Sequence, residues 1–124
     1  MGLDMTQEDK ELLLKDLCAR LPYGVKCEVK YYDDAWELLA IYTNGTTYAA
    51  RDIGYPIETY FEDCKPYLFP LSSMTEEQRL EYYGTFSLSG DISGSVDFYN
   101  KNHLDWRGLI PMGLAIDATG KNIY

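Results

Sequence analysis

The sequence predicts an α+β fold, in which an N-terminal helix precedes an antiparallel β-meander of about three to five strands and two further short helices. Three observations predict it. Apolar residues recur at helical spacing near the N-terminus, they alternate with polar residues in the next stretch, and an Asn-Gly pair separates two β-prone runs. The length of 124 residues suits one hydrophobic core, so residues 1–124 are expected to form a single domain.

The N-terminal helix is predicted over residues 7–20. Thr6 is a typical N-cap residue, and the acidic residues that follow it favour the helix dipole. Pro22 and Gly24 end the helix. One face is expected in the core because leucines recur there at helical spacing, at Leu13, Leu14, Leu17 and Leu21.

The meander follows directly. Residues 25–31 alternate between apolar and polar side chains, which is typical of a half-buried strand. After a turn at Asp33-Asp34, residues 35–42 form a second predicted strand. Asn44-Gly45 then predicts a type I′ hairpin turn, because both central residues of that turn need positive φ. The chain returns as a third strand over residues 46–50.

The stretch from residue 51 to 71 is less regular because glycine and prolines interrupt it. Residues 57–61 fit either a short helix or a strand. Residues 67–69 lie between two prolines and fit an edge strand or a buried extended segment. Thr75 and Gln78 have the spacing of a capping box, which predicts a helix over residues 76–83 that ends at Gly84.

The last third of the chain is predicted to contain one helix and one strand. Residues 84–95 are rich in glycine and serine and predict a mobile loop. Ser95 is expected to cap a short helix that continues to about His103, with Val96 and Tyr99 inward. Residues 104–116 are expected to be extended, kinked and largely buried, ending as a strand near 114–116. The tail from Asp117 is expected to fray.

The charge pattern limits the classes of partner. The formal net charge is −9, so general binding of nucleic acid is not expected. The acids are dispersed, which is first of all typical of a soluble surface and second of a face that meets a basic partner. Three cysteines, a polar N-terminus without a signal peptide and no bilayer-length apolar run predict a reduced, cytoplasmic protein without membrane attachment.

Two stretches, Lys65–Glu77 and Leu104–Ala115, together with Leu12–Gly24, resemble a set of small uncharacterised hypothetical proteins from Bacteroides-type gut bacteria and their phages and mobile elements. The hairpin and the Gly/Ser-rich stretch look less typical of that set. The resemblance implies a bacterial cytoplasm or a phage-infected host cell as the setting. It carries over no catalytic residue.

Catalytic and metal-binding patterns are weak. His103 and Asp105 lie near several serines, but no G-x-S-x-G motif is present and their spacing does not suit pairing on a helix. A pair of Cys64 and His103 is equally weak, since Glu62 and Asp63 disfavour a thiolate. No metal-ligand motif and no phosphate-binding loop occurs, so no cofactor and no metal are predicted.

The turn from Asp105 to Gly108 is the best candidate for binding. Trp106 beside Arg107 can stack on a flat ligand, and the arginine can hold a carboxylate or phosphate. The alternative, which is favoured, is that the arginine pairs with Asp105 or with a backbone carbonyl and so locks the turn, while Trp106 lies in the core. Ser72 and Ser73, which precede the helix predicted over residues 76–83, could likewise cap that helix or hold an anion. The candidate binding residues are Trp106, Arg107, Asp105, His103, Tyr67, Ser72 and Ser73.

These observations favour a non-enzymatic binding protein. It would act on a protein partner with a basic surface, as an accessory protein or inhibitor in phage or mobile-element biology. The acidic charge, the twelve tyrosines and the missing catalytic motif favour this hypothesis. The alternative is a protein that binds or sequesters a small anionic ligand such as a nucleotide. A small hydrolase that uses carboxylates or His103 is the third hypothesis.

Overall fold

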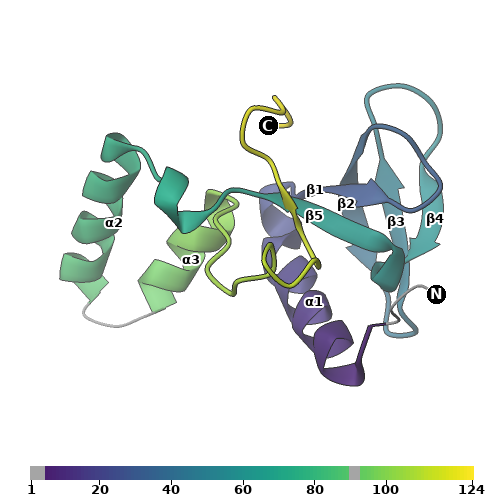
Figure 1. The fold of residues 1–124 in the computed structure, drawn as a ribbon, viewed down its shortest axis with the longest axis horizontal. Helices are drawn as coiled ribbons and strands as arrows, with labels where there is room; N and C mark the ends of the chain where they lie inside the picture. Colours follow the sequence, from purple (N-terminus) through teal and green to yellow (C-terminus); the bar gives the residue numbers. More distant parts are fainter. Residues whose placement is uncertain (1–4, 90–92) are drawn as a thin grey trace.

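A mostly antiparallel six-stranded sheet, helix α1 (Gln7–Arg20) and a pair of helices, α2 (Glu76–Ser89) and α3 (Ser93–Lys101), make up the fold (Figure 1). The computed structural model describes residues 5–89 and 93–124. In Figure 1 the helix pair lies at the end of the molecule away from strands β3 and β4. The predicted α+β class, with an N-terminal helix, a meander and two further helices, is confirmed.

Helix α1 has the predicted limits. Thr6 accepts a hydrogen bond from the Asp9 N–H at 3.0 Å, which caps the first turn. Leu13 and Leu17 are fully buried against the sheet. A 3₁₀ turn, Leu21–Tyr23, continues the helix and ends at Gly24, whose φ of 69° favours glycine.

The sheet has the strand order β4-β3-β2-β1-β5-β6. Neighbouring strands are antiparallel except β5 and β6, which are parallel. The predicted meander is therefore present as β1 to β4. The strands are β1 (Lys26–Val29), β2 (Ala35–Ile41), β3 (Thr46–Ala50), β4 (Ile57–Tyr60), β5 (Cys64–Leu68) and β6 (Ile116–Asp117).

The hairpin between β2 and β3 forms at the predicted place, but the predicted type I′ turn is wrong. Gly45 has a φ of 89°, whereas Asn44 does not take positive φ. The loop is one residue longer, since the Tyr42 N–H donates to the Thr46 carbonyl at 2.8 Å. Gly45 alone takes the left-handed conformation, so Asn44 instead uses its Oδ1 to accept the Thr46 N–H at 3.0 Å.

The two faces of the sheet differ. One face packs on α1 and buries Cys27, Val29, Trp36, Leu38 and Ala49. The other face, here called the open face, carries Lys26, Glu37, Leu39, Tyr48, Glu58 and Tyr60. Leu38 pairs with Ala49 and Ala40 with Tyr48, so Leu39 is an extra residue in a β-bulge. The bulge leaves Leu39 47% exposed.

The region between the meander and the helix pair is more regular than predicted. Residues 57–60 form a strand, followed by a 3₁₀ turn, Phe61–Asp63. Tyr67 and Leu68 are buried and extended in β5, but not at an edge, because β5 lies between β1 and β6. Pro66 is tolerated there because β6 pairs only with Tyr67 and Leu68.

The capping box of α2 is confirmed, whereas its predicted end is wrong. The Thr75 N–H donates to Gln78 Oε1 at 2.9 Å, and the Gln78 N–H donates to Thr75 Oγ1 at 3.1 Å. The helix continues through Gly84 to Ser89. One glycine costs a helix interior only about 1 kcal/mol, which packing against α3 offsets.

The predicted mobile loop at residues 84–95 is therefore helical up to Ser89 and again from Ser93, and residues 90–92 lie outside the described part of the chain. Helix α3 also starts two residues before the predicted Ser95 and ends at Lys101, because His103 takes a left-handed φ of 56°. Among residues 96–101, Phe98 and Asn100 are buried, and Val96 and Tyr99 are half-buried.

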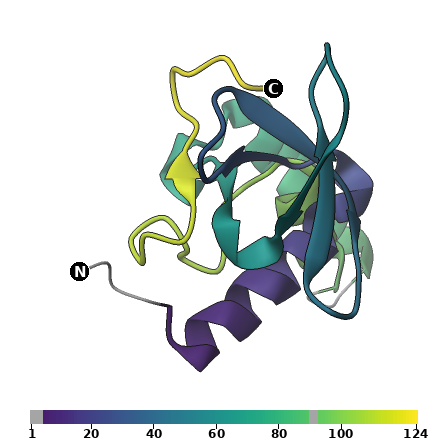
Figure 2. The same cartoon turned by 90° about the vertical axis from the view of Figure 1, so that its right-hand side faces the viewer.

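The C-terminal segment packs as a second part of the core. Leu109, Leu114 and Ala115 bury against Leu68, and the final strand forms at residues 116–117 rather than 114–116. Figures 1 and 2 show the tail rising past the sheet on the side away from α1. The prediction that the tail frays is wrong, because the Tyr124 hydroxyl bonds to the backbone of Lys26 and Tyr67.

None of the helices within residues 5–89 and 93–124 has the length and apolar character that crossing a bilayer requires.

Candidate functional site

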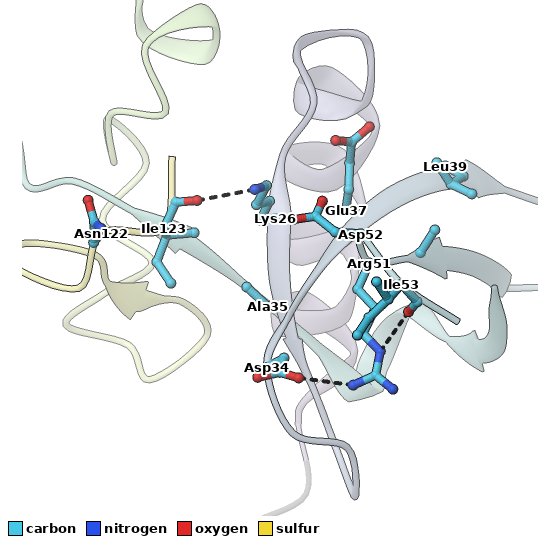
Figure 3. Close-up of a pocket in the computed structure, with 11 residues that line it drawn as sticks. Lys26, Asp34, Ala35, Glu37, Leu39, Arg51, Asp52, Ile53, Asn122 and Ile123 are labelled. Carbon is cyan, nitrogen blue, oxygen red and sulfur yellow. Dashed lines mark hydrogen bonds and ion pairs between the residues drawn. The ribbon is translucent and has the colours of Figure 1, made fainter. Parts of the chain in front are cut away.

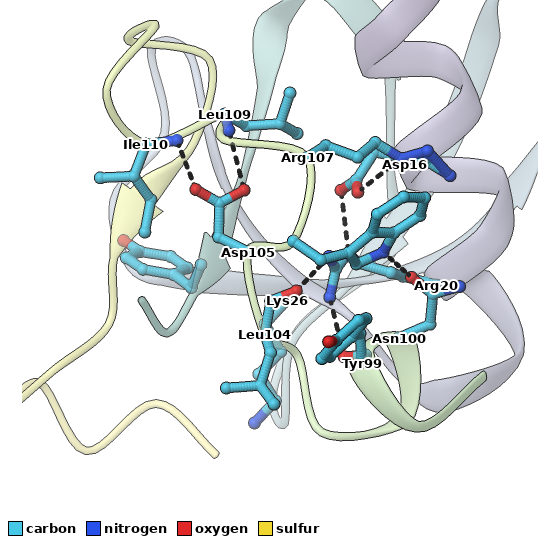
Figure 4. A network of polar contacts seen from close by, with 12 residues as sticks. Asp16, Arg20, Lys26, Tyr99, Asn100, Leu104, Asp105, Arg107, Leu109 and Ile110 are labelled. Atoms are coloured by element: carbon cyan, nitrogen blue, oxygen red, sulfur yellow. Dashed lines mark hydrogen bonds and ion pairs between the residues drawn. The ribbon is translucent and has the colours of Figure 1, made fainter. Parts of the chain in front are cut away.

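A buried ionic cluster joins α1 to the C-terminal third of the chain (Figure 4). Asp16 and Arg20 lie one turn apart on α1, and both side chains are fully buried. Arg20 donates from Nε to Asp16 Oδ2 at 2.9 Å and from Nη2 to the Leu104 carbonyl at 2.6 Å. A longer bond runs from Nη1 to the Tyr99 carbonyl at 3.4 Å. The Arg20 guanidinium therefore donates hydrogen bonds to two backbone carbonyls at the C-terminal end of α3 and just after it.

Arg107 completes this cluster. Its Nε lies 3.4 Å from Asp16 Oδ1, so one carboxylate serves two guanidinium groups. Burial raises the pKa of Asp16, although the charges of Arg20 and Arg107 oppose this rise. The Arg107 side chain is only 15% exposed. Asp16, Arg20 and Arg107 are called the ionic cluster below.

Trp106 is half-buried and contacts two neighbouring side chains. The Arg107 guanidinium lies 4.1 Å from the centre of its ring, and Tyr99 stacks on it at 6.2 Å with an interplanar angle of 22°. Its Nε1 donates to Asn100 Oδ1 at 3.1 Å. A flat ligand on Trp106 would compete with these neighbours for the ring. The arrangement resembles the favoured alternative, in which Arg107 stabilises the fold. Its partner, however, is Asp16 and not Asp105.

Asp105 and His103 serve the local backbone. Asp105 accepts the N–H groups of Leu109 and Ile110 at 2.8 and 2.9 Å, which fixes the turn after Trp106. The buried His103 ring stacks on Tyr124 at 3.9 Å, and its Nδ1 has no hydrogen-bond partner among the described residues. Burial, and secondarily the charge of Arg20, lowers the pKa of His103 to about 4. The imidazole is therefore neutral at pH 7.

The other three predicted site residues lie elsewhere. Tyr67 is in β5, and its carbonyl accepts the Tyr124 hydroxyl. Ser72 and Ser73 are exposed in a 3₁₀ turn, Leu71–Ser73, where Ser73 Oγ donates to the Pro70 carbonyl at 2.7 Å. Thus four of the seven candidates, Asp105, Trp106, Arg107 and His103, come together around the ionic cluster.

The two buried cysteines, Cys27 and Cys64, have thiols that are hard to ionise. Burial raises the pKa of the Cys64 thiol to about 11, so it is not a thiolate at neutral pH. Burial also raises the pKa of Cys27 well above its ordinary value. In the part of the chain that the structure describes, no group of three or more His, Cys, Asp or Glu side chains could hold a metal ion.

A hollow of about 500 Å³ opens on the open face and was not predicted from the sequence (Figure 3). Strands β1 and β2 form its floor, the loop after β3 one wall and the C-terminal tail the other. It is called the open-face hollow and is lined by Lys26, Asp34, Ala35, Glu37, Leu39, Ala50, Arg51, Asp52, Ile53, Asn122 and Ile123.

The two cations of the open-face hollow are held by the protein itself. Arg51 donates to Asp34 Oδ2 at 2.9 Å and to the Ile53 carbonyl at 3.1 Å, and it lies over the Trp36 ring. The Lys26 ammonium donates to the Ile123 carbonyl at 3.2 Å.

The carboxylates of Glu37 and Asp52, in contrast, form no hydrogen bond or ion pair within the described residues. Leu39 and Ile53 add apolar surface, with Ile53 76% exposed. The hollow therefore offers free negative charge beside apolar contacts.

Part of the signal for this site is in the sequence. The alternation in residues 25–31 places Lys26 on the polar face of its strand, whereas residues 35–42 are apolar on both faces and do not place Glu37. The β-bulge that exposes Leu39 and the docking of the tail have no local pattern, so they could not be found.

The comparisons add no relative: no protein-family model, curated protein or solved structure matches this chain. The resemblance to small phage and bacterial proteins stays a prediction.

Proposed function

We propose that the protein is a non-enzymatic binding protein that captures a basic protein partner on the open face of its sheet. The observation that carries this proposal is the charge arrangement in the open-face hollow. Lys26 and Arg51 are engaged by the chain itself, while the Glu37 and Asp52 carboxylates remain open to solvent. Complementary charge guides association and selects the partner.

Tyrosine on the same surface supports this proposal. Eight of the thirteen exposed large apolar side chains in the described ranges are tyrosines, and two of these, Tyr42 and Tyr60, belong to the open face. Tyr42 and Tyr60 lie at the far end of the open face from the tail, and Tyr48 bonds to Glu58 there at 3.2 Å. A partner could gain apolar ring contacts beside the charge pairs.

The ionic cluster strengthens the charge asymmetry. Two of the eleven basic residues, Arg20 and Arg107, are withdrawn from the surface into the cluster. The resemblance adds a setting: in a phage or mobile element, such a protein would be an accessory protein that inhibits a basic host or phage protein in the cytoplasm.

The test is the binding of a ten-lysine peptide by isothermal titration calorimetry. We expect measurable affinity at about 20 mM salt and a loss of roughly tenfold at about 200 mM, since salt screens exposed charges. The variant Glu37→Gln/Asp52→Asn should bind several-fold more weakly. The matched control Glu76→Gln/Glu77→Gln, on α2 and of equal charge, should bind as the wild type does.

Two outcomes would overturn the proposal. One is no binding of the peptide at low salt. The other is an equal loss in both variants, because that result would assign binding to net charge and not to the open face.

A second candidate, binding of a small anion, is favoured by one observation. Three lysines line another hollow of about 590 Å³, although three acids line it as well: Lys10, Lys30, Lys65, Glu28, Glu62 and Asp63. Thermal-shift measurements with phosphate and nucleotides test this candidate. Stabilisation by any of them that is lost in Lys30→Gln/Lys65→Gln would favour it over the basic partner.

A further inference from the structure

Lys26 and Glu37 are direct cross-strand neighbours on the open face, yet they do not form an ion pair. Their Cα atoms are paired in the register of β1 and β2. Directly opposite residues have Cβ atoms about 5 Å apart, so opposite charges at such positions can usually meet. No ion pair joins them here, and the ammonium of Lys26 instead bonds to the Ile123 carbonyl. The tail therefore binds Lys26, the residue that is placed to pair with Glu37.

Tyr124 holds the tail in the place where this happens. Its O–H donates to the Tyr67 carbonyl at 2.8 Å, and its oxygen accepts the Lys26 N–H at 2.9 Å. The register of β1 and β5 ends at Cys27 and Pro66, so the hydroxyl bridges the strands where the next pair would lie. The ring also stacks on His103. Burial raises the pKa of Tyr124, and the hydroxyl, which is already protonated at neutral pH, can act as a donor.

These contacts couple the tail to the charge in the open-face hollow. Asn122 and Ile123, the residues just before Tyr124, form one wall of the hollow. If the tail left this position, the Ile123 carbonyl would leave with it. The Lys26 ammonium would then pair with the Glu37 carboxylate, and a cation from outside would have to displace it.

We propose that Tyr124 is a positioning residue for partner binding: it fixes the tail so that Ile123 holds Lys26 and the Glu37 carboxylate stays free for a basic side chain of the partner. The proposal rests on the proposed function, since it concerns the same open face and the same class of partner. It adds that Lys26 competes with the partner for the Glu37 carboxylate, and that Tyr124 prevents this competition by fixing the tail.

The test is a double-mutant cycle with the ten-lysine peptide as probe. Tyr124→Phe removes only the hydroxyl and should weaken binding about three- to fivefold, the effect of one exposed charge pair. Lys26→Met removes the competitor, so Tyr124→Phe should have no effect in that background. Tyr83→Phe makes the same chemical change on α2, away from the sheet, and should bind as the wild type does.

The cycle separates the possible outcomes. A purely structural role of Tyr124 would weaken binding equally with and without Lys26, and that result would overturn the inference. Unchanged affinity in Tyr124→Phe would overturn it as well. In both cases the proposed function survives, provided that the wild type binds the peptide. Absence of binding by the wild type would instead remove the proposed function itself.

Amide hydrogen exchange provides the second measurement. Residues 118–124 should exchange faster in Tyr124→Phe than in the wild type, since the backbone of the tail loses its anchor. The same increase should occur in Tyr124→Phe/Lys26→Met, although this double variant should bind the peptide with the same affinity as Lys26→Met. Unchanged exchange of the tail in Tyr124→Phe would contradict the positioning role.

Discussion

The ionic cluster and the open-face hollow use the same types of charged side chain in opposite ways. In the cluster, Asp16 and Arg20 are fully buried and each charge has a partner. In the hollow, the cations are held while Glu37 and Asp52 face solvent alone. A buried charge must be paired because its desolvation is costly, whereas an exposed charge can stay free for a partner. The comparison therefore separates charges that maintain the fold from charges available for binding.

The largest expected effect is on the cluster side. Asp16→Ala leaves two guanidinium groups without their carboxylate, so we expect a loss of about 3 to 5 kcal/mol in the free energy of unfolding. Urea denaturation measures it. Lys15→Ala, on the exposed side of the same helix turn, should change stability by less than about 0.5 kcal/mol. Equal effects of the two substitutions would remove the distinction between buried and exposed charges.

The second effect concerns pH. The pKa of His103 is about 4 in the folded protein and about 6.5 when unfolded, so between these values the unfolded state binds more protons. Stability should be full above pH 6.5 and should fall as the pH decreases towards 4, by on the order of 2 to 3 kcal/mol. His103→Gln should flatten this part of the stability profile. A profile identical to that of the wild type would show that His103 does not cause the dependence.

A smaller effect is expected at the edge of the cluster. Trp106→Phe keeps an aromatic ring between Arg107 and Tyr99 but removes the hydrogen bond to Asn100. We expect a loss of about 1 to 2 kcal/mol, since the buried Asn100 acceptor loses its partner. Thermal unfolding monitored by near-UV circular dichroism measures it. A loss as large as that of Asp16→Ala would place Trp106 within the essential part of the cluster.

The smallest effect on stability is expected in the hollow. Glu37→Gln/Asp52→Asn removes two charges that have no partner among the described residues, so stability should change by less than about 0.5 kcal/mol. The same variant should bind the lysine peptide more weakly. Denaturation and calorimetry on one preparation measure both quantities. A marked loss of stability would mean that these carboxylates maintain the fold instead.

Sequence patterns predicted the regular elements because their causes are local. The leucine spacing and Thr6 define α1, and the Thr75–Gln78 pair defines the start of α2. The end of α2 and the turn at Asn44 depend on tertiary packing and loop length, so local patterns gave the wrong result there.

Less of the candidate site than of the fold could be predicted from the sequence. Asp16 and Arg20 stand four residues apart on the same side as Leu13 and Leu17, which could have indicated a buried pair. The tail wall of the hollow depends on contacts of Lys26 with residues almost a hundred positions later, and no local pattern reveals these.

The ionic cluster also has a consequence for synthesis of the chain. Arg20 bonds to a carbonyl 84 residues later, and Asp16 meets an arginine 91 residues later. The ribosome synthesises α1 long before it adds Leu104 and Arg107. Until then, Asp16 and Arg20 of the nascent helix lack these two hydrogen-bond partners. Contacts of such long sequence separation slow folding. We therefore expect the domain to reach its native state only after residues 104–107 have been synthesised and can meet α1.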